Sequence, residues 1–206
     1  MTRRRSPVRL ANVVRTLPHR GHGVPRKTVR ESQRWRLLEG MVEATAQHGY
    51  ADATVADVIG FARVSRKAFY EHFTDKQDCF LATYDVVSDR MIAQLVAAGS
   101  GHAAGLARRR AYVLGYLAAL DRDLAVARVF TVDVLGAGQR VLERRDAVNR
   151  RFADELFGDS RLDVVRRVAV VGGVNAVVAS ELLDPKPQLL ALGESLTAFV
   201  QAALRS

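Results

Sequence analysis

Apolar residues recur at helical spacing through most of this chain, and this periodicity limits the fold more than any other feature. From Ser32 onward they return every three or four positions, as at Leu38, Val42 and Ala46, which places them on one side of an α-helix. The 206 residues include only five prolines, and no stretch alternates apolar with polar residues as a half-buried strand does. The spacing predicts an all-α protein of about nine helices, with a small N-terminal unit and a larger C-terminal helical bundle.

The segment 54–73 has the pattern of a helix-turn-helix. Thr54 and Ser65 each stand where they can cap the start of a short helix, and Arg63 and Val64 interrupt the apolar spacing between the two helices. In such a motif the second helix places its N-terminal end in the major groove of DNA, so it needs an apolar face to hold it and a polar face to bind. The predicted apolar face consists of Ala68, Phe69 and Phe73.

This part of the chain, from about Leu38 to Tyr84, resembles the DNA-binding domain of the TetR family of regulators. The matching residues are Gly49-Tyr50, Thr54-Val55, Asp57-Val58-Ile59, Val64-Ser65, Phe69-Tyr70-Glu71-His72-Phe73 and Asp75-Lys76. The segment that contains them covers about a fifth of the chain, and its most specific part is Tyr70, His72 and Phe73 followed by Lys76. The resemblance implies a three-helix DNA-binding domain followed by a ligand-binding and dimerisation domain. We place these domains at 31–78 and 79–206.

Two positions depart from the family pattern. Arg63 stands where the family usually has glycine in the tight turn, and a positive φ there costs a non-glycine residue about 1 kcal/mol. Two interpretations stay open: Arg63 accepts that cost because it reaches a phosphate, or the turn simply differs. Ala46 stands where the first helix usually has an aromatic residue, and we expect Tyr50 or Phe61 to fill that space.

The residues expected to contact DNA lie in or beside this motif. Thr54 and Ser65 begin helices, where a hydroxyl and nearby backbone N–H groups suit phosphate oxygens, although plain capping explains them too. Arg66 and Lys67 begin the second helix, where an arginine can bind guanine O6 and N7, with a non-specific phosphate contact as the alternative. The resemblance implies that Tyr70 and His72 contact phosphates, and Lys76 is a further expected anchor because a lysine opposes the helix dipole there. The predicted DNA-binding set is Thr54, Arg63, Ser65, Arg66, Lys67, Tyr70, His72 and Lys76.

The first 30 residues differ from the rest in charge. They contain nine arginines and lysines and no acidic residue, which equals the formal net charge of +9 for the whole chain. Proline and glycine recur among them, so we predict a basic, largely disordered arm over 1–30. Such an arm is attracted to DNA, RNA or anionic membrane, and it suits a minor groove or a phosphate backbone. A solvated tail, or a translation start assigned too far upstream, is the alternative.

The family resemblance also implies an effector pocket and a homodimer in the C-terminal domain. The candidate pocket residues are Tyr112, Tyr116, Arg128, Asp133 and Asn175, for each of which a surface or interface position is the alternative. The apolar setting favours a hydrophobic or amphipathic small-molecule effector. The last two helices, about 162–183 and 188–204, are expected to form the dimer interface, with an intramolecular core as the alternative. The predicted interface residues are Val168, Val171, Val174, Val178, Leu182, Leu192, Leu196 and Phe199.

Other classes of function are disfavoured by the motifs. The five histidines have no metal-ligand spacing, and no phosphate-binding loop or nucleophile motif occurs, so we expect no enzyme activity, no metal and no cofactor. The one cysteine, Cys79, favours a reducing cytoplasm, and no apolar run is long enough for a membrane span. We therefore predict a repressor that binds a palindromic operator in double-stranded DNA and is released by an effector. The alternatives are a regulator without a small-molecule ligand and a non-specific nucleic-acid binder that depends on the arm.

Overall fold

The computed structural model describes residues 26–158 and 160–204, and every regular element in them is a helix, which confirms the all-α prediction. The α-helices are α1 Arg26–Asp52, α2 Val55–Ala62, α3 Arg66–His72, α4 Lys76–Gly99, α5 Leu106–Asp121, α6 Leu124–Thr131, α7 Gln139–Phe157, α8 Val164–Glu181 and α9 Gly193–Ala202. Two short 3-10 helices, η1 Asp133–Gly136 and η2 Leu189–Leu192, precede α7 and α9. The chain divides into two compact units between Val86 and Val87, within α4. The expected domain boundary at residue 78 falls before this division and stays a prediction.

Helix α1 begins earlier than the sequence pattern suggested. It starts at Arg26, so residues 26–30 of the predicted disordered arm are helical, and this part of the prediction is wrong. The physical reason is that Pro25 is the last proline before α1, and residues 26–30 contain neither proline nor glycine to interrupt a helix. Residues 1–25, the remainder of the predicted arm, lie outside the described residues. Near its other end α1 leaves helical geometry at Gly49, whose φ of 75° and ψ of 158° suit glycine.

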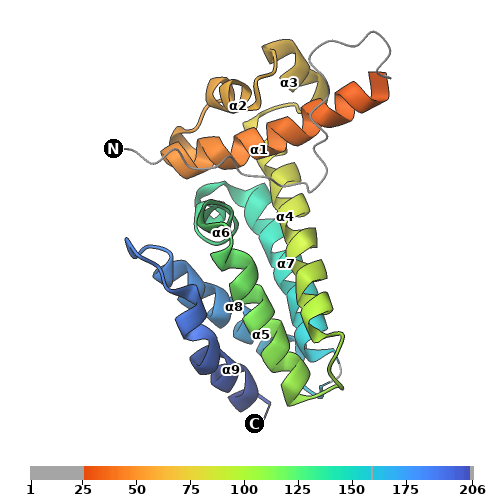
Figure 1. Ribbon diagram of the computed structural model, residues 1–206, viewed down its shortest axis with the longest axis vertical. Coiled ribbons are helices and arrows are strands. Elements are labelled where there is room, and N and C mark those ends of the chain that lie inside the picture. The colour runs from red at the N-terminus through yellow and green to blue at the C-terminus, as the bar shows by residue number, and fades with distance from the viewer. Residues whose placement is uncertain (1–25, 159, 205–206) are drawn as a thin grey trace. The chain divides into compact units, whose positions relative to one another are not determined.

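The N-terminal unit packs α2 and α3 on the same side of α1 (Figure 1). Contact between α1 and α2 is close at Gly40, where an added Cβ would lie 2.6 Å from the carbonyl oxygen of Val58 and 3.1 Å from Cβ of Ala62. On α3, Phe69 is fully buried. Tyr50, one of two candidates to replace an aromatic residue at position 46, packs edge-on against Phe80 with ring centroids 4.7 Å apart. The other candidate, Phe61, is exposed.

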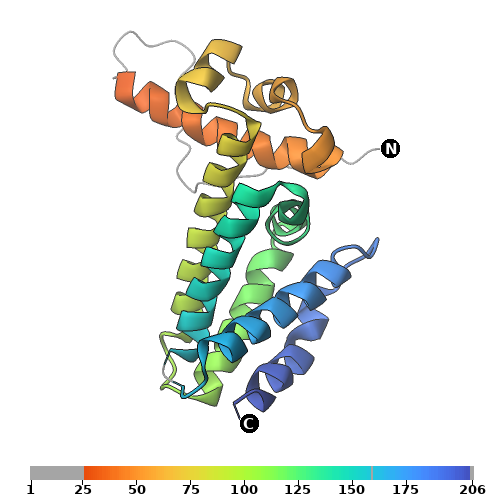
Figure 2. The ribbon, with the colours of Figure 1, turned by 180° about the vertical axis from the view of Figure 1, so that it is seen from behind.

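The C-terminal unit is a bundle in which α8 and α9 lie side by side, as both Figure 1 and Figure 2 show. The ring of Phe199 on α9 covers Gly173 on α8, where an added Cβ would lie 3.1 Å from the ring. On α5, Leu114 approaches Gly193 at the start of α9. An ion pair of 2.8 Å joins Arg151 on α7 to Asp89 on α4. None of the helices in the described part of the chain is long and apolar enough to cross a membrane.

The faces of α8 and α9 are not those expected from the sequence. Five of the eight residues predicted for a dimer interface are buried inside the single chain: Val171, Val174, Val178, Leu182 and Leu196. That part of the prediction is wrong, because α8 is apolar on nearly every side and the apolar pattern does not reveal which side faces the chain's own core. Val168 and Leu192 are half-buried, and Phe199 is 45% exposed.

Candidate DNA-binding surface and interior pocket

Helix α3 turns a polar face to solvent. Its apolar residues Ala68 and Phe69 are buried against the N-terminal unit, whereas Arg66, Lys67 and Tyr70 are exposed. Tyr70 is 50% exposed, and its ring meets the ring of Phe69 edge-on at 5.2 Å. The guanidinium carbon of Arg66 lies 5.8 Å from the centroid of the Tyr70 ring. The predicted apolar face of Ala68, Phe69 and Phe73 is buried as expected, whereas contact of the exposed side with a partner stays a prediction.

Lys67 forms a weak, exposed salt bridge that does not prevent its ammonium group from binding another anion. Its Nζ lies 4.0 Å from a carboxylate oxygen of Glu71, one helical turn away, and the two side chains are 88% and 54% exposed. Exposed pairs of this kind contribute only about 0.3–0.5 kcal/mol, so a phosphate can displace the carboxylate at little cost. Lys67 is thus free to bind an anion.

The two capping residues differ in what they can still donate. Thr54 donates its hydroxyl to Asp57 Oδ2 at 2.6 Å and its backbone N–H to the same oxygen at 2.8 Å, and these bonds lower the pKa of the Asp57 carboxyl. Both donors of Thr54 are thus engaged, and the adjacent carboxylate repels phosphate, which argues against a direct phosphate contact by this hydroxyl. Ser65 accepts from the N–H of Ala68 at 3.1 Å, and its exposed hydroxyl keeps its own hydrogen for a phosphate.

Arg63 forms the tight turn between α2 and α3. Its φ of 52° and ψ of 48° are left-handed, and it is the single non-glycine residue with positive φ in the described ranges. Glycine adopts this conformation without penalty, whereas the side chain of Arg63 makes it strained. The carbonyl oxygen of Arg63 accepts a hydrogen bond from Arg36 Nη1 at 3.2 Å, and its side chain is exposed.

His72, the last residue of α3, is less available than its expected role requires. Its Nε2 atom is buried and has no hydrogen-bond partner. Burial lowers the pKa of the imidazole, and the positive charges of Arg30 and Arg34 lower it further, against a weaker opposite effect of Glu71. The lowered pKa favours the neutral form of the ring, and the burial of Nε2 argues against a phosphate contact through this atom. Tyr70 stays the better candidate of this pair.

Lys76 was predicted to contact phosphate, but its ammonium group is hydrogen-bonded to backbone carbonyls of the protein itself. Its ammonium donates to the carbonyl oxygens of Tyr50 at 2.8 Å, Ala51 at 3.2 Å and Ala53 at 2.8 Å, and it lies 4.4 Å from the Tyr50 ring centroid. An ammonium has three hydrogens, so these bonds use its full donor capacity. The phosphate-anchor prediction is corrected accordingly: Lys76 satisfies carbonyls that the end of α1 leaves without helical partners.

Arg30 and Arg34, which were not among the predicted DNA-binding residues, lie beside the end of α3. Arg30 Nη2 donates to the carbonyl oxygen of Glu71 at 3.2 Å, and the guanidinium carbon of Arg34 lies 5.4 Å from the Phe73 ring centroid. Both belong to α1, where a spacing of four residues places them on one side. The spacing is present in the sequence, but it places the two residues on one side of a helix only because α1 already begins at Arg26.

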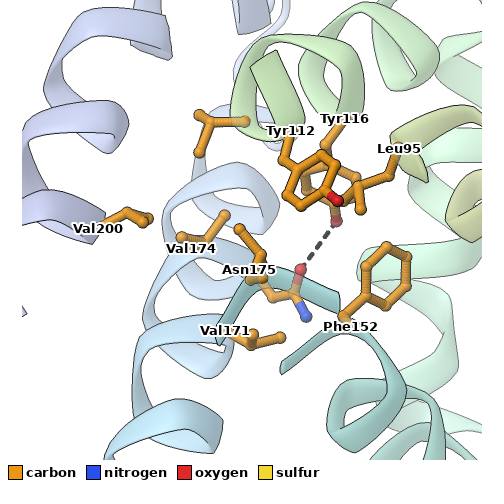
Figure 3. Close-up of a pocket in the computed structure, with 10 residues that line it drawn as sticks. Leu95, Tyr112, Tyr116, Phe152, Val171, Val174, Asn175 and Val200 are labelled. Carbon is orange, nitrogen blue, oxygen red and sulfur yellow. Dashed lines mark hydrogen bonds between the residues drawn. The ribbon is translucent and has the colours of Figure 1, made fainter. Parts of the chain in front are cut away.

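A pocket inside the C-terminal unit is lined by three of the five predicted ligand residues, Tyr112, Tyr116 and Asn175 (Figure 3). The Tyr116 hydroxyl donates to Asn175 Oδ1 at 2.8 Å, and Asn175 Nδ2 donates to Asn149 Oδ1 at 3.0 Å. The other lining residues are Leu95, Val113, Phe152, Leu156, Val171, Val174 and Val200. The pocket is thus mainly apolar, and the side chains of Tyr116 and Asn175 at its wall are hydrogen-bonded to each other. The volume of the cavity is about 20 Å³.

The other two predicted pocket residues lie elsewhere. Arg128 donates from Nη1 to the carbonyl oxygen of Leu182 at 2.8 Å, where it satisfies a carbonyl at the end of α8. Asp133 begins η1 and is not among the lining residues. The prediction that Arg128 and Asp133 line the pocket is therefore wrong. The polar side chains at the pocket bond to one another between different helices, and the sequence does not reveal which helices pack together. Within the described ranges no cluster of histidine, cysteine or acidic residues could hold a metal ion.

The DNA-binding segment matches a known family. Residues 37–83 match the family described as bacterial regulatory proteins, tetR family. Over 50 residues the chain is 42% identical to the HTH-type transcriptional repressor AcnR of Corynebacterium diphtheriae. That match covers 24% of this chain and 26% of AcnR, so it spans about a quarter of the relative.

Solved structures resemble a larger part of the chain. FadR of Bacillus subtilis, a transcriptional regulator in complex with stearoyl-CoA, has a TM-score of 0.72 at 17% identity, with 82% of this chain and 97% of FadR covered. A TetR-like transcriptional regulator from Rhodococcus sp. RHA1 has a TM-score of 0.65 at 20% identity, with 89% of this chain and 99% of that protein covered. At these identities the likeness establishes the fold.

Proposed function

Because the chain belongs to the tetR family of bacterial regulatory proteins, we propose that it is a dimeric repressor that binds a palindromic DNA operator and is released from it by a hydrophobic or amphipathic effector. The family consists of regulatory proteins, which agrees with the expectation that the chain is not an enzyme. The observation that supports DNA recognition most strongly is the exposed face of α3. There Arg66 and Lys67 precede Tyr70 on a helix that Ala68 and Phe69 hold in place.

Each exposed residue has a distinct task in this proposal. Arg66 suits a bidentate contact with guanine, since it stands in the first turn of α3, which enters the major groove. Tyr70 and Ser65 suit phosphates, because both have an exposed hydroxyl. Loss of a base contact should relax the sequence preference, whereas loss of a phosphate contact should weaken binding to all sequences alike.

The test is selection of bound sequences from random duplex DNA, at about 150 mM salt where specific binding is distinguished from non-specific binding. We expect the full chain to enrich a palindrome with half-sites about one helical turn apart. The double variant Arg66→Ala with Tyr70→Ala should lose that enrichment while keeping the melting temperature. Enrichment of the same palindrome by this variant would exclude α3 as the recognition helix.

We propose that the exposed side of α8 and α9 forms the dimer interface. Most residues of this interface differ from those predicted from the sequence, because five of the eight predicted residues are buried within the chain. On α8 this side contains Val165, which is 73% exposed, and Val177, which is 42% exposed, and on α9 it contains Phe199. Gly172 has open space beyond its backbone, which permits close approach of a second copy. Val177→Glu with Phe199→Glu should convert the dimer to a monomer in light scattering, whereas Leu106→Glu, at an exposed leucine on α5, should leave it dimeric.

For the effector we propose a molecule with an apolar chain, which would enter the pocket beside Tyr116 and Asn175. The apolar lining supports this proposal, and so does FadR of Bacillus subtilis, whose structure contains stearoyl-CoA. Stearoyl-CoA should release the protein from its operator, and Asn175→Leu should change the concentration needed. An apolar ligand can shift this equilibrium only if it binds the released state more tightly.

A second candidate, a regulator that responds to no small molecule, is favoured by the size of the pocket. A cavity of about 20 Å³ holds roughly one water molecule, so lining side chains must move before a ligand can enter. If acyl-CoA molecules of several chain lengths neither bind nor release the operator, this second candidate replaces the first.

A further inference from the structure

We propose that the first turns of α1 form a second DNA-binding element, in which Arg30 and Arg34 contact phosphates of the operator backbone beside the C-terminal end of α3. The inference rests on the proposed function, since it assumes that α3 enters the major groove. It goes further by assigning backbone contacts to a helical segment outside the helix-turn-helix. It also replaces part of the role expected for the disordered arm.

The position of the two arginines is fixed by contacts with the recognition helix. The 3.2 Å hydrogen bond from Arg30 to the carbonyl oxygen of Glu71 fixes one guanidinium at the last turn of α3. The guanidinium of Arg34, 5.4 Å from the Phe73 ring centroid, lies just beyond the helix end. Both arginines are exposed, so these contacts orient them without covering them.

These side chains keep most of their capacity to donate. A guanidinium has five N–H groups, and Arg30 uses one of them on the carbonyl of Glu71. The contact of Arg34 with Phe73 involves the face of a ring, which leaves the guanidinium edge free for a phosphate. Lys76, at the start of α4, has no remaining donor. In this proposal the cations that contact phosphates therefore come from α1 and not from α4.

The dimensions of DNA place a phosphate within reach. Helix α3 has seven residues and is therefore roughly 10 Å long, whereas the major groove is about 12 Å wide. When the N-terminal end of α3 contacts bases, its C-terminal end lies near the edge of the groove, where the phosphates are. Arg30 and Arg34 are held at that end.

The charges at the start of α1 are unfavourable for the helix itself. Its first turn contains no acidic residue, although Asp and Glu are stabilising there, and instead Lys27 and Arg30 stand near the positive end of the helix dipole. His72 nearby is kept neutral, and the exposed Glu31 and Glu71 offset the local charge only in part. A positive cluster that weakens its own helix is explained by an anionic partner, and duplex DNA is the anion that the neighbouring α3 implies.

The experiment is a salt titration of DNA binding by the full chain, read by fluorescence anisotropy. Each phosphate contact contributes about 0.9 to the slope of log Kd against log salt concentration. Arg30→Gln with Arg34→Gln should therefore reduce that slope by about 1.8 and weaken binding to the operator and to a scrambled duplex by the same factor. Arg30→Lys with Arg34→Lys keeps both charges and should restore the slope. The matched control is Arg150→Gln with Arg161→Gln, two exposed arginines of the C-terminal unit, which should leave the slope unchanged.

The outcomes separate this inference from the proposed function. An unchanged slope in the Arg30 and Arg34 glutamine variant, while Arg66→Ala with Tyr70→Ala abolishes specific binding, would overturn the inference and leave the proposed function standing. A lower melting temperature together with loss of preference for the operator would also overturn it, because the arginines would then act by holding α3. Specific binding that survives in the Arg66 and Tyr70 variant would contradict the proposed function itself.

Discussion

The N-terminal unit and the helical bundle use their polar side chains in different ways. In the N-terminal unit these side chains fix the ends of helices: Ser65 caps α3, and Lys76 satisfies carbonyls at the end of α1. In the bundle, Tyr116, Asn175 and Asn149 bond to one another across α5, α8 and α7, over separations of 59 and 26 residues. Capping therefore follows largely from local sequence, whereas the bundle's polar network depends on the packing of distant helices.

The largest expected effect is at the contact between α1 and α2. Gly40→Ala should destabilise the N-terminal unit by about 3 kcal/mol, because the new Cβ would lie 2.6 Å from the carbonyl oxygen of Val58 and backbone atoms cannot move aside. Trp35, the single tryptophan of the chain, lies in α1, so its fluorescence during urea unfolding should report the loss.

Gly60 offers the matched control in the same unit. It lies within α2 with nothing within 4 Å of an added Cβ, so Gly60→Ala should stabilise the unit by about 0.5–1 kcal/mol. Equal effects of the two substitutions would mean that helix propensity, and not the close contact at Gly40, determines stability here.

The next largest effect tests whether Lys76 stabilises the end of α1 and does not contact a phosphate. Lys76→Met keeps much of the side-chain length but leaves the carbonyls of Tyr50, Ala51 and Ala53 without their donor, which should cost about 2 kcal/mol. The salt dependence of DNA binding should stay the same, since no phosphate contact is lost. A normal midpoint in urea combined with a slope reduced by about 0.9 would restore the phosphate-anchor role.

A smaller effect is expected in the bundle, where a side chain and not the backbone opposes the added atom. A Cβ at Gly99 would lie 2.0 Å from the Tyr112 ring, so Gly99→Ala should displace this pocket residue and destabilise the bundle by about 1.5 kcal/mol. Hydrogen exchange should become faster along α5, while the Trp35 fluorescence midpoint stays in place. Gly172→Ala, on α8 with open space around it, is the control. Equal exchange along α5 in both variants would show that Tyr112 does not pack against Gly99.

The same contrast explains what the sequence could predict. The caps at Thr54 and Ser65 and the buried face of α3 follow from local spacing, and each was predicted. Whether Arg63 adopts a left-handed conformation was left open by the sequence, and the structure shows that it does. The orientation of α8 was not, because Val165 at 73% exposed and Val178 at 0% are both apolar, and only contacts with distant helices distinguish them. Arg30 was missed for a related reason: its position depends on a contact with Glu71, 41 residues away.

The smallest effect concerns the turn itself, and it tests whether Arg63 accepts its left-handed conformation because its side chain reaches a phosphate. Arg63→Gly relieves a left-handed conformation worth about 1 kcal/mol, but glycine also gives the unfolded chain more freedom, so the net gain in stability should be about 0.5 kcal/mol or less. If the guanidinium reaches a phosphate, the same variant should lower the slope of the salt titration by about 0.9, and Arg63→Lys should retain it. A glycine variant that binds DNA with the original slope would show that the strained turn is tolerated without any contact to DNA.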